Sequence, residues 1–282
     1  MNCACDHLGL KESARIWRAD DIGDVELLHA RYVTHSFARH THEGAAIGVI
    51  EAGAERFIYR GATHVATAGQ VIIFNPAEVH TGEGADKNGW QFRMFYLDAA
   101  LLAKAASETV GSSRDVPFFP TAVLEDASLA KMIRLLHQSL EASGTSLERQ
   151  SKFVWTFAQL AQRYADDRPT ELLIGSEHSA VKLIRDYLED HYCENVSLDE
   201  IAALTNLSTY HLIRVFRAKV GLPPHAYLEQ VRINRAKVLL RAGMTISNVA
   251  LSTGFVDQSH FSKHFKKMMG VTPGNYQAIS AR

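Results

Sequence analysis

The sequence predicts a two-domain α+β protein: an N-terminal β-barrel with a helical hairpin, then an all-α domain with two helix-turn-helix units joined by a linker helix. Short β-type segments separated by turn residues fill residues 25–98, and two amphipathic helical patterns follow them. One helix-turn-helix pattern then occurs twice near the C-terminus. A chain of 282 residues is long for one domain and comfortable for two.

The barrel is predicted from β-type segments that include Ala46–Ile50, Glu55–Tyr59, Val71–Phe74 and Gln91–Leu97. Glycines and an Asn-Pro pair separate these segments at the spacing typical of a sandwich or barrel. Alternation along the last segment puts Trp90, Phe92, Met94 and Tyr96 on one face and Arg93 on the other. The pattern leaves open which face points inward.

The hairpin is predicted from two apolar stripes at helical spacing, one over residues 129–140 and one over residues 153–164. A break at residues 142–146 turns one helix back on the other. A polar, proline-bearing segment follows and predicts a linker over residues 166–177. The domains are therefore expected at residues 1–165 and 178–282.

The first helix-turn-helix unit is predicted over about residues 197–217. Ser197 and Glu200 fit a capping box at the start of its first helix. Asn206 suits a turn with positive φ. Leu212 and Phe216 lie four residues apart, so they would anchor the second helix and leave its opposite face free.

The second unit repeats this pattern over about residues 245–267. Gly254 takes the turn position, and Phe261 and Phe265 form the anchoring pair. Its turn is one residue longer, and its free face carries more hydrogen-bonding side chains. We therefore expect the second unit to make more of the base contacts and the first to contribute mainly anchoring.

Charge supports a polyanionic partner for this region. Residues 205–282 carry eleven Lys and Arg against two Asp and Glu, a net of +9, whereas the whole chain has a net charge of −1. A basic segment in a near-neutral protein is typical of nucleic-acid binding. An ordinary solvated helical face is the alternative, and the repetition of the pattern argues against it.

The segment from about Ser197 to Tyr276 resembles the DNA-binding domain of AraC/XylS-type regulators over its full length. The resemblance includes the linker helix over residues 226–240, the stretch 254–267 and the closing stretch 270–276. It implies that the two second helices enter adjacent major grooves. The DNA-binding candidates that follow are Thr209, Tyr210, Ile213, Arg214, Arg217, Gln258, Ser259, His260 and Lys263.

Residues 25–98 look similar to the cupin-like sensor domain of the same family, through Arg39 to His42 and Ala68 to His80. Metal-binding cupins use a His-x-His pair, a nearby Glu and a distant His. Here His40, His42 and His80 match, while the Glu position falls near Ala46 or Ile47. Three histidines can hold zinc with an open position, but we favour the alternative in which they line a ligand pocket without metal.

The barrel is accordingly expected to bind a small anionic or hydroxylated effector, with no cofactor. The resemblance suggests Arg39 as a ligand contact, although pairing with Glu43 on the surface is an equal alternative. The candidate effector-binding residues are Arg39, His42, His80, Trp90, Arg93 and Tyr96.

The sequence thus predicts a sequence-specific transcriptional regulator and not an enzyme. Its expected partners are double-stranded DNA, a small-molecule effector, a second copy of the chain and RNA polymerase. Two alternatives stay open: a metal-dependent cupin enzyme fused to a DNA-binding domain, and an effector-independent regulator whose barrel only dimerises.

Cysteine usage and hydropathy predict a cytoplasmic protein. Cys3, Cys5 and Cys193 make no disulfide framework. The Cys3-Ala-Cys5 pair invites a metal interpretation, but a mobile terminus is the preferred one. The sequence contains neither an apolar run long enough for a membrane span nor a secretory signal pattern.

Overall fold

The computed structural model describes residues 12–23, 25–110, 115–166, 178–269 and 271–280. Cys3, Cys5 and nearly all of the predicted linker lie outside these residues. The chain forms two compact units, each described by itself. The barrel unit comprises residues 1–106, 113–137 and 159–169, and the helical unit comprises residues 107–112, 138–158 and 170–282.

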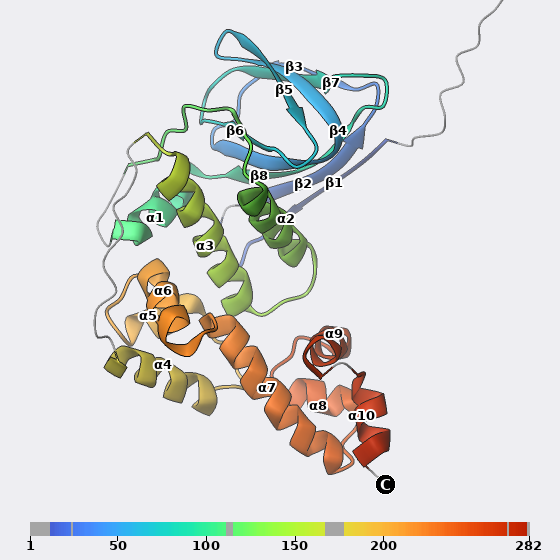
Figure 1. The fold of residues 1–282 in the computed structure, drawn as a ribbon, viewed down its shortest axis with the longest axis vertical. Helices are drawn as coiled ribbons and strands as arrows, with labels where there is room; N and C mark the ends of the chain where they lie inside the picture. Colours follow the sequence, from blue (N-terminus) through green and yellow to red (C-terminus); the bar gives the residue numbers. More distant parts are fainter. Residues whose placement is uncertain (1–11, 24, 111–114, 167–177, 270, 281–282) are drawn as a thin grey trace, which may run out of the picture. The chain divides into compact units, whose positions relative to one another are not determined.

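The barrel unit is built from antiparallel strands, as predicted (Figure 1). Its strands are β1 Ser13–Arg18, β2 Val25–Tyr32, β3 Ser36–His40, β4 Ala45–Tyr59, β5 Ala62–Thr67, β6 Val71–Phe74, β7 His80–Gly84, β8 Trp90–Leu97 and β9 Val123–Leu124. One sheet has the order β1-β2-β8-β4-β6-β9, and β3, β7 and β5 extend the barrel through β4.

Strand β4 joins the two halves of the barrel. The sequence suggested two strands separated by Gly53, but the structure has one long strand that bends there. A register shift lies between Ile50 and Ala52, and Gly53 has φ +69°. A Cβ at Gly53 would lie 2.0 Å from the Gly89 carbonyl oxygen, so only glycine fits. The bend lets β4 pair with β6 and β8 before it and with β5 and β7 after it.

The structure settles which face of β8 points inward. Trp90, Phe92 and Met94 belong to the barrel core with Phe57 and Phe74, and Tyr96 packs against this core. The opposite face of β8 lies outside the barrel, where Phe95 packs edge-on against His137 at 5.0 Å between ring centroids. The inward face is therefore the aromatic one.

Helix α1 Ala99–Val110 follows β8, and helices α2 Ala127–Glu141 and α3 Ser146–Tyr164 follow β9. The predicted hairpin corresponds to α2 and α3. Strand β1 and helix α1 lie outside the predicted elements. The side chains of β1 are almost all exposed, so it lacks the alternation of a half-buried strand, and α1 has no acidic residue in its first turn and no basic residue in its last.

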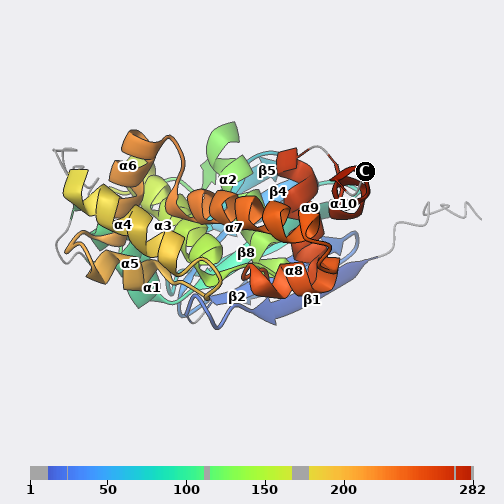
Figure 2. The same ribbon diagram turned by 90° about the horizontal axis from the view of Figure 1, so that it is seen from below.

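The helical unit contains the rest of the helices: α4 His178–Asp190, α5 Leu198–Ala203, α6 Thr209–Val220, α7 Pro224–Arg241, α8 Ile246–Ser252, α9 Gln258–Met269 and α10 Pro273–Ser280. Helix α7 runs from the α4–α6 group to the α8–α10 group (Figure 2). Its Leu228 belongs to the first apolar core, and its Ile233, Ala236 and Leu240 belong to the second. Helix α7 is therefore the predicted linker helix, and it is built into both cores.

None of the described helices is both long enough and apolar enough to span a membrane.

Candidate nucleic-acid interface and effector cavity

The first helix-turn-helix unit forms as its sequence predicts. The Ser197 hydroxyl accepts from the Glu200 N–H, and the Glu200 carboxylate accepts from the Ser197 N–H, which completes the capping box. Asn206 has φ +54° in the turn, and α6 begins three residues later. Leu212 and Phe216 are fully buried. These contacts fix the direction of α6.

The second unit has the same architecture with a longer turn. Gly254 has φ +76°, and α9 begins four residues later. A Cβ there would lie 2.8 Å from the carbonyl oxygens of Tyr192 and Cys193, so the turn needs glycine for space as well as for conformation. Phe261 and Phe265 are fully buried, as predicted.

A buried arginine of α7 connects the loop before the first helix-turn-helix unit to the second helix-turn-helix unit. The Arg232 guanidinium donates to the carbonyl oxygens of Tyr192 and Glu194, each at 2.7 Å. It also lies 5.9 Å from the Phe255 ring of the second unit. Burial lowers the pKa of Arg232 to about 10, so it stays charged at neutral pH. Arg232 thus ties the loop after α4 to the second helix-turn-helix unit.

Five of the nine predicted DNA-binding side chains are accessible. Arg217, Gln258, Ser259 and Lys263 are exposed, and Arg214 is half-buried. They come from α6 and α9, the second helices of the two units. Three of the four exposed residues belong to α9.

The other four predicted DNA contacts, Thr209, Tyr210, Ile213 and His260, are buried. The prediction that these four side chains lie exposed on the surface is therefore corrected. The prediction assumed that the face of each second helix opposite its anchoring pair is free. In the helical unit, residues of α1 and of the first half of α3 cover that face.

On the first unit the cover is aromatic and hydrogen-bonded. The Trp155 ring stacks on Tyr210 at 5.4 Å, and the Arg217 guanidinium lies 5.5 Å from the Trp155 ring. At the start of α6, the Thr209 N–H donates to the Glu108 carboxylate at 2.6 Å. Ile213 shares one apolar core with Leu147. Helix α6 therefore packs against α3 at the positions that the sequence predicts to meet DNA.

On the second unit the cover is polar. Ser143 donates to the Asp257 carboxylate at 3.1 Å, just before α9. The Glu148 carboxylate lies 3.9 Å from the Nε2 of His260. Although burial by itself would raise the pKa of Glu148, the neighbouring His260 and Lys152 bring it well below its usual range. An ionised carboxylate of α3 therefore faces α9.

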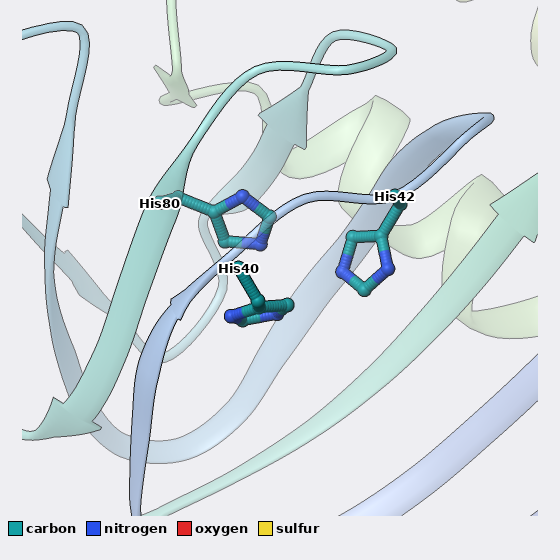
Figure 3. Close-up of side chains that lie close together, drawn as sticks. All are labelled: His40, His42 and His80. Atoms are coloured by element: carbon teal, nitrogen blue, oxygen red, sulfur yellow. The ribbon is translucent and has the colours of Figure 1, made fainter.

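In the barrel unit the three predicted histidines converge. His40 at the end of β3, His42 just after it and His80 at the start of β7 point toward one another (Figure 3). Each offers a ring nitrogen within 4.8 Å of the others. Burial, and then the neighbouring histidines, lower the pKa of His42 and of His80 to about 4. These two imidazoles are therefore neutral at pH 7.

Backbone contacts orient two of these rings. The Nδ1 atoms of His40 and His80 lie 2.8 and 3.1 Å from the carbonyl oxygens of Ala38 and Glu78. Such bonds leave each Nε2 with a lone pair that can accept a proton or bind a metal. His80 also stacks on Phe74 at 3.9 Å. The rings are therefore held in place before any ligand binds.

A buried carboxyl lies in the same cavity. Glu55 of β4 is 5% exposed, and burial raises its pKa to about 8, so it carries a proton at neutral pH. It lines a small cavity of about 30 Å³ with the three histidines and Tyr96. Ala46 and Ile47, the expected carboxylate positions, are buried apolar residues. In the described residues, the metal-type cluster contains the histidines but not Glu55.

Sequence reasoning missed Glu55 although a signal was present. Glu55, Phe57 and Tyr59 alternate along β4, and all three are buried, while Arg56 and Ile58 are exposed. Because Phe57 and Tyr59 must face the core, the same alternation places Glu55 inside. The cupin pattern, in contrast, points only to the residues just after His42.

A larger hollow of about 520 Å³ shares part of this lining. Phe37, His42 and Tyr96 line both spaces. The hollow is also lined by Arg18, Glu26, Glu43 and Asp98. Its size lies within the range of small-molecule sites.

The predicted effector residues divide into two groups. His42, His80 and Tyr96 line the inner cavity. Trp90 is a buried core residue, and Arg93 lies on the outer face of β8, where it pairs with Glu51 at 2.9 Å and approaches His137. Arg39 is exposed and lines a separate hollow of about 390 Å³ beside His80. Alternation turns Arg93 away from the cavity, which corrects that part of the prediction.

Comparisons with known proteins match both the N-terminal and the C-terminal part of the chain to transcriptional regulators. The family model for an AraC-like ligand binding domain matches residues 22–156, and the model for a helix-turn-helix domain matches residues 201–279. The chain is 32% identical over 252 residues to the uncharacterized HTH-type transcriptional regulator YbfI of Bacillus subtilis, covering 89% of this chain and 90% of that protein.

It is also 26% identical over 243 residues to the HTH-type transcriptional activator RhaS of Escherichia fergusonii, covering 84% of this chain and 86% of that protein. Among solved structures, a transcriptional regulator of Chromobacterium violaceum with an AraC-type DNA-binding domain is 28% identical. That match covers 38% of this chain and 96% of the other, with a TM-score of 0.35.

Proposed function

This chain belongs to the AraC family of DNA-binding transcriptional regulators, and on that premise we propose which of its residues read DNA and what its barrel senses. We propose that α6 and α9 enter adjacent major grooves, with Arg217, Gln258, Ser259 and Lys263 as the first contacts. The observation that carries this proposal is the duplicated unit, with exposed polar and basic side chains on both second helices.

Arg217→Ala and Lys263→Ala are each expected to weaken binding to a cognate site by about 1–3 kcal/mol if the lost contact is to a base edge. A lost phosphate contact would instead flatten the salt dependence of binding by about one charge. The measurement is the dissociation constant for a duplex that the wild-type protein selects from random DNA, at several salt concentrations.

Lys182→Ala is the matched control, because Lys182 is exposed on α4 and lies outside both second helices. It removes the same charge and should change affinity little. If Arg217→Ala and Lys263→Ala bind as the wild type does, or no more weakly than Lys182→Ala, then α6 and α9 are not the reading helices.

The barrel is proposed to sense a small hydroxylated, uncharged molecule. His42 and His80 are neutral at pH 7 and Glu55 is protonated, so the inner cavity offers hydrogen bonds without net charge. The adjoining hollow is lined by three carboxylates and one arginine, which disfavours an anion. Regulation requires that the effector bind one arrangement of the protein more tightly than another.

An effector of this kind is expected to raise the melting temperature with concentration, equivalent to about 2.7 kcal/mol at a hundred times its Kd. Thermal-shift measurement across neutral polyols and their acid derivatives would identify it. His42→Ala and Tyr96→Phe should reduce the shift, while Arg39→Ala should preserve it. A shift lost with Arg39→Ala and kept with His42→Ala would place the ligand in the other hollow.

Homodimerisation through the α2–α3 hairpin, contact with RNA polymerase and the absence of catalysis stay proposals. The relatives are named as regulators, which supports a sensor over an enzyme. The enzyme alternative needs a metal at His40, His42 and His80 and a base that turns substrate over. Metal analysis of the purified protein, with His40→Ala and His80→Ala, separates the two.

A further inference from the structure

A second cluster of metal-type ligands lies in the helical unit, away from the barrel histidines. Glu148 of α3 meets His260 and His264 of α9, with one potential ligand atom from each within 4.8 Å of the others. His260 and His264 are one helical turn apart, so both rings lie on the same side of α9. Their ring centroids are 4.4 Å apart.

The side chain of His260 is the main evidence for a ligand at this cluster. It is 7% exposed, and both of its ring nitrogens are buried without a hydrogen-bond partner among the described residues. A buried polar group without a hydrogen-bond partner destabilises the folded protein, so natural proteins rarely leave one without a reason. The nearest acidic oxygen, the Oε2 of Glu148, is 3.9 Å away. That separation is too long for a hydrogen bond and leaves room for bridging by an ion.

The other two side chains are held as metal ligands usually are. The Nδ1 of His264 pairs with the Glu229 carboxylate of α7, which leaves its Nε2 for a ligand. Carboxylates hold zinc-binding histidines in this way. Lys152 binds the Oε1 of Glu148 at 2.6 Å, while the Oε2 faces His260. Each residue therefore keeps one donor atom for the centre of the cluster.

We propose that Glu148, His260 and His264 bind a divalent transition-metal ion of the Zn²⁺ class. Two imidazole nitrogens and one carboxylate oxygen form a donor set that zinc uses, with water at a fourth position. Ligand bonds of about 2.0–2.2 Å need the three donors closer than 4.8 Å, so the proposal requires the three side chains to move together when the metal binds.

Metal at this site would link α3 to the second recognition helix. His260 is a predicted DNA contact, and it cannot serve a metal and a base at once. The site itself does not depend on the proposed reading of DNA. Its expected effect, that zinc opposes DNA binding, rests on that proposal.

The experiment uses the full chain with His40→Ala and His80→Ala, which removes the barrel histidines from the measurement. After treatment with a chelator, this double variant is titrated with Co²⁺ and then with Zn²⁺. We expect one equivalent of Co²⁺ with the visible absorption of a four-coordinate site, displaced by one equivalent of Zn²⁺. Failure to bind either metal stoichiometrically would overturn the proposal.

Variants in the same background then assign the ligands. Glu148→Gln and His264→Gln should each weaken Zn²⁺ binding by at least about 100-fold, and Glu229→Gln by about 10–100-fold, as for a residue that orients a ligand. His191→Ala is the matched control, since it removes an exposed histidine of the same unit that pairs with Glu194. Circular dichroism verifies that each variant is folded. Binding that survives both Glu148→Gln and His264→Gln would refute this ligand set.

DNA binding provides the second measurement. Zn²⁺ should weaken binding of the double variant to its selected duplex, and Glu148→Gln should remove that response while DNA binding persists. Stoichiometric metal without a DNA response would refute only the coupling. The DNA affinity of Arg217→Ala and Lys263→Ala is measured without metal. The proposal about the DNA-reading helices and the proposal about the metal site can therefore fail separately.

Discussion

Replacing Glu55 with glutamine is expected to raise the free energy of unfolding by about 2–3 kcal/mol at pH 7. The wild-type side chain is 5% exposed on the inner face of β4, and its Oε2 has no hydrogen-bond partner among the described residues. A carboxyl buried in this way resists ionisation. Glutamine has nearly the same shape and no charge to bury.

The stabilising effect of Glu55→Gln follows from the difference between the pKa of Glu55 in the unfolded chain and its pKa in the folded protein. Burial raises its pKa from 4.5 to about 8 in the folded protein. Below pH 4.5 both states are protonated and the folded protein incurs no penalty. Between about pH 4.5 and 8 the unfolded chain loses its proton while the folded protein keeps it, so stability falls as pH rises. Glu55→Gln should remove this fall.

Urea unfolding of wild type and variant from pH 5 to pH 8 measures the effect, with the difference between them growing toward pH 8. Glu83→Gln is the control, because it removes a half-exposed carboxyl of β7 that pairs with Arg56. It should change stability by about 1 kcal/mol or less, without that slope. A constant difference between wild type and Glu55→Gln across this range would show that Glu55 ionises normally.

The histidines of the same cavity affect the free energy of unfolding at acidic pH. Burial lowers the pKa of His42 and of His80 from 6.5 to about 4. Their unfolded forms bind protons below pH 6.5 while the folded protein stays neutral there, so their contribution to stability is lost as pH falls toward 4. Together with Glu55, they favour maximal stability in mildly acidic solution.

The parts of the fold that sequence predicts best depend on local chemistry. The capping box at Ser197, the turns at Asn206 and Gly254 and the anchoring pairs of α6 and α9 formed as expected. Each follows from residues within one or two helical turns. The convergence of His40, His42 and His80 was also predictable, although only through family resemblance.

The remaining features depend on contacts between distant segments. Sequence could not decide which face of β8 points inward, because both faces carry large side chains. It also could not show that Trp155 covers Tyr210 or that Glu148 approaches His260, since these pairs are 55 and 112 residues apart in sequence. Of the nine predicted DNA contacts, five are therefore accessible, and the other four are buried against α1 and α3, which no local pattern connects to them.

That cover leads to the second large effect: Trp155→Ala is expected to tighten DNA binding, by about 5- to 30-fold. Trp155 stacks on Tyr210, and Val154 and Leu147 of the same helix pack on the core that contains Ile213. While α3 lies there, Tyr210 and Ile213 cannot meet DNA. If only a small fraction of molecules has α3 displaced, the apparent Kd exceeds the intrinsic Kd by the inverse of that fraction. Removing a large aromatic contact, worth roughly 1–2 kcal/mol for a partly buried ring, increases the fraction.

The dissociation constant of Trp155→Ala for the selected duplex checks this, with Val238→Ala as control, because Val238 is 63% exposed on α7. Hydrogen exchange supplies a second measurement: residues 146–158 and the start of α6 should exchange faster in Trp155→Ala without global unfolding. If exchange increases while DNA affinity stays constant or falls, α3 supports the recognition helix and does not restrain it. If Trp155→Ala both binds DNA more tightly and exchanges faster, α3 must be displaced before DNA binds. An effector, or a metal at Glu148, would then regulate DNA binding by controlling that displacement.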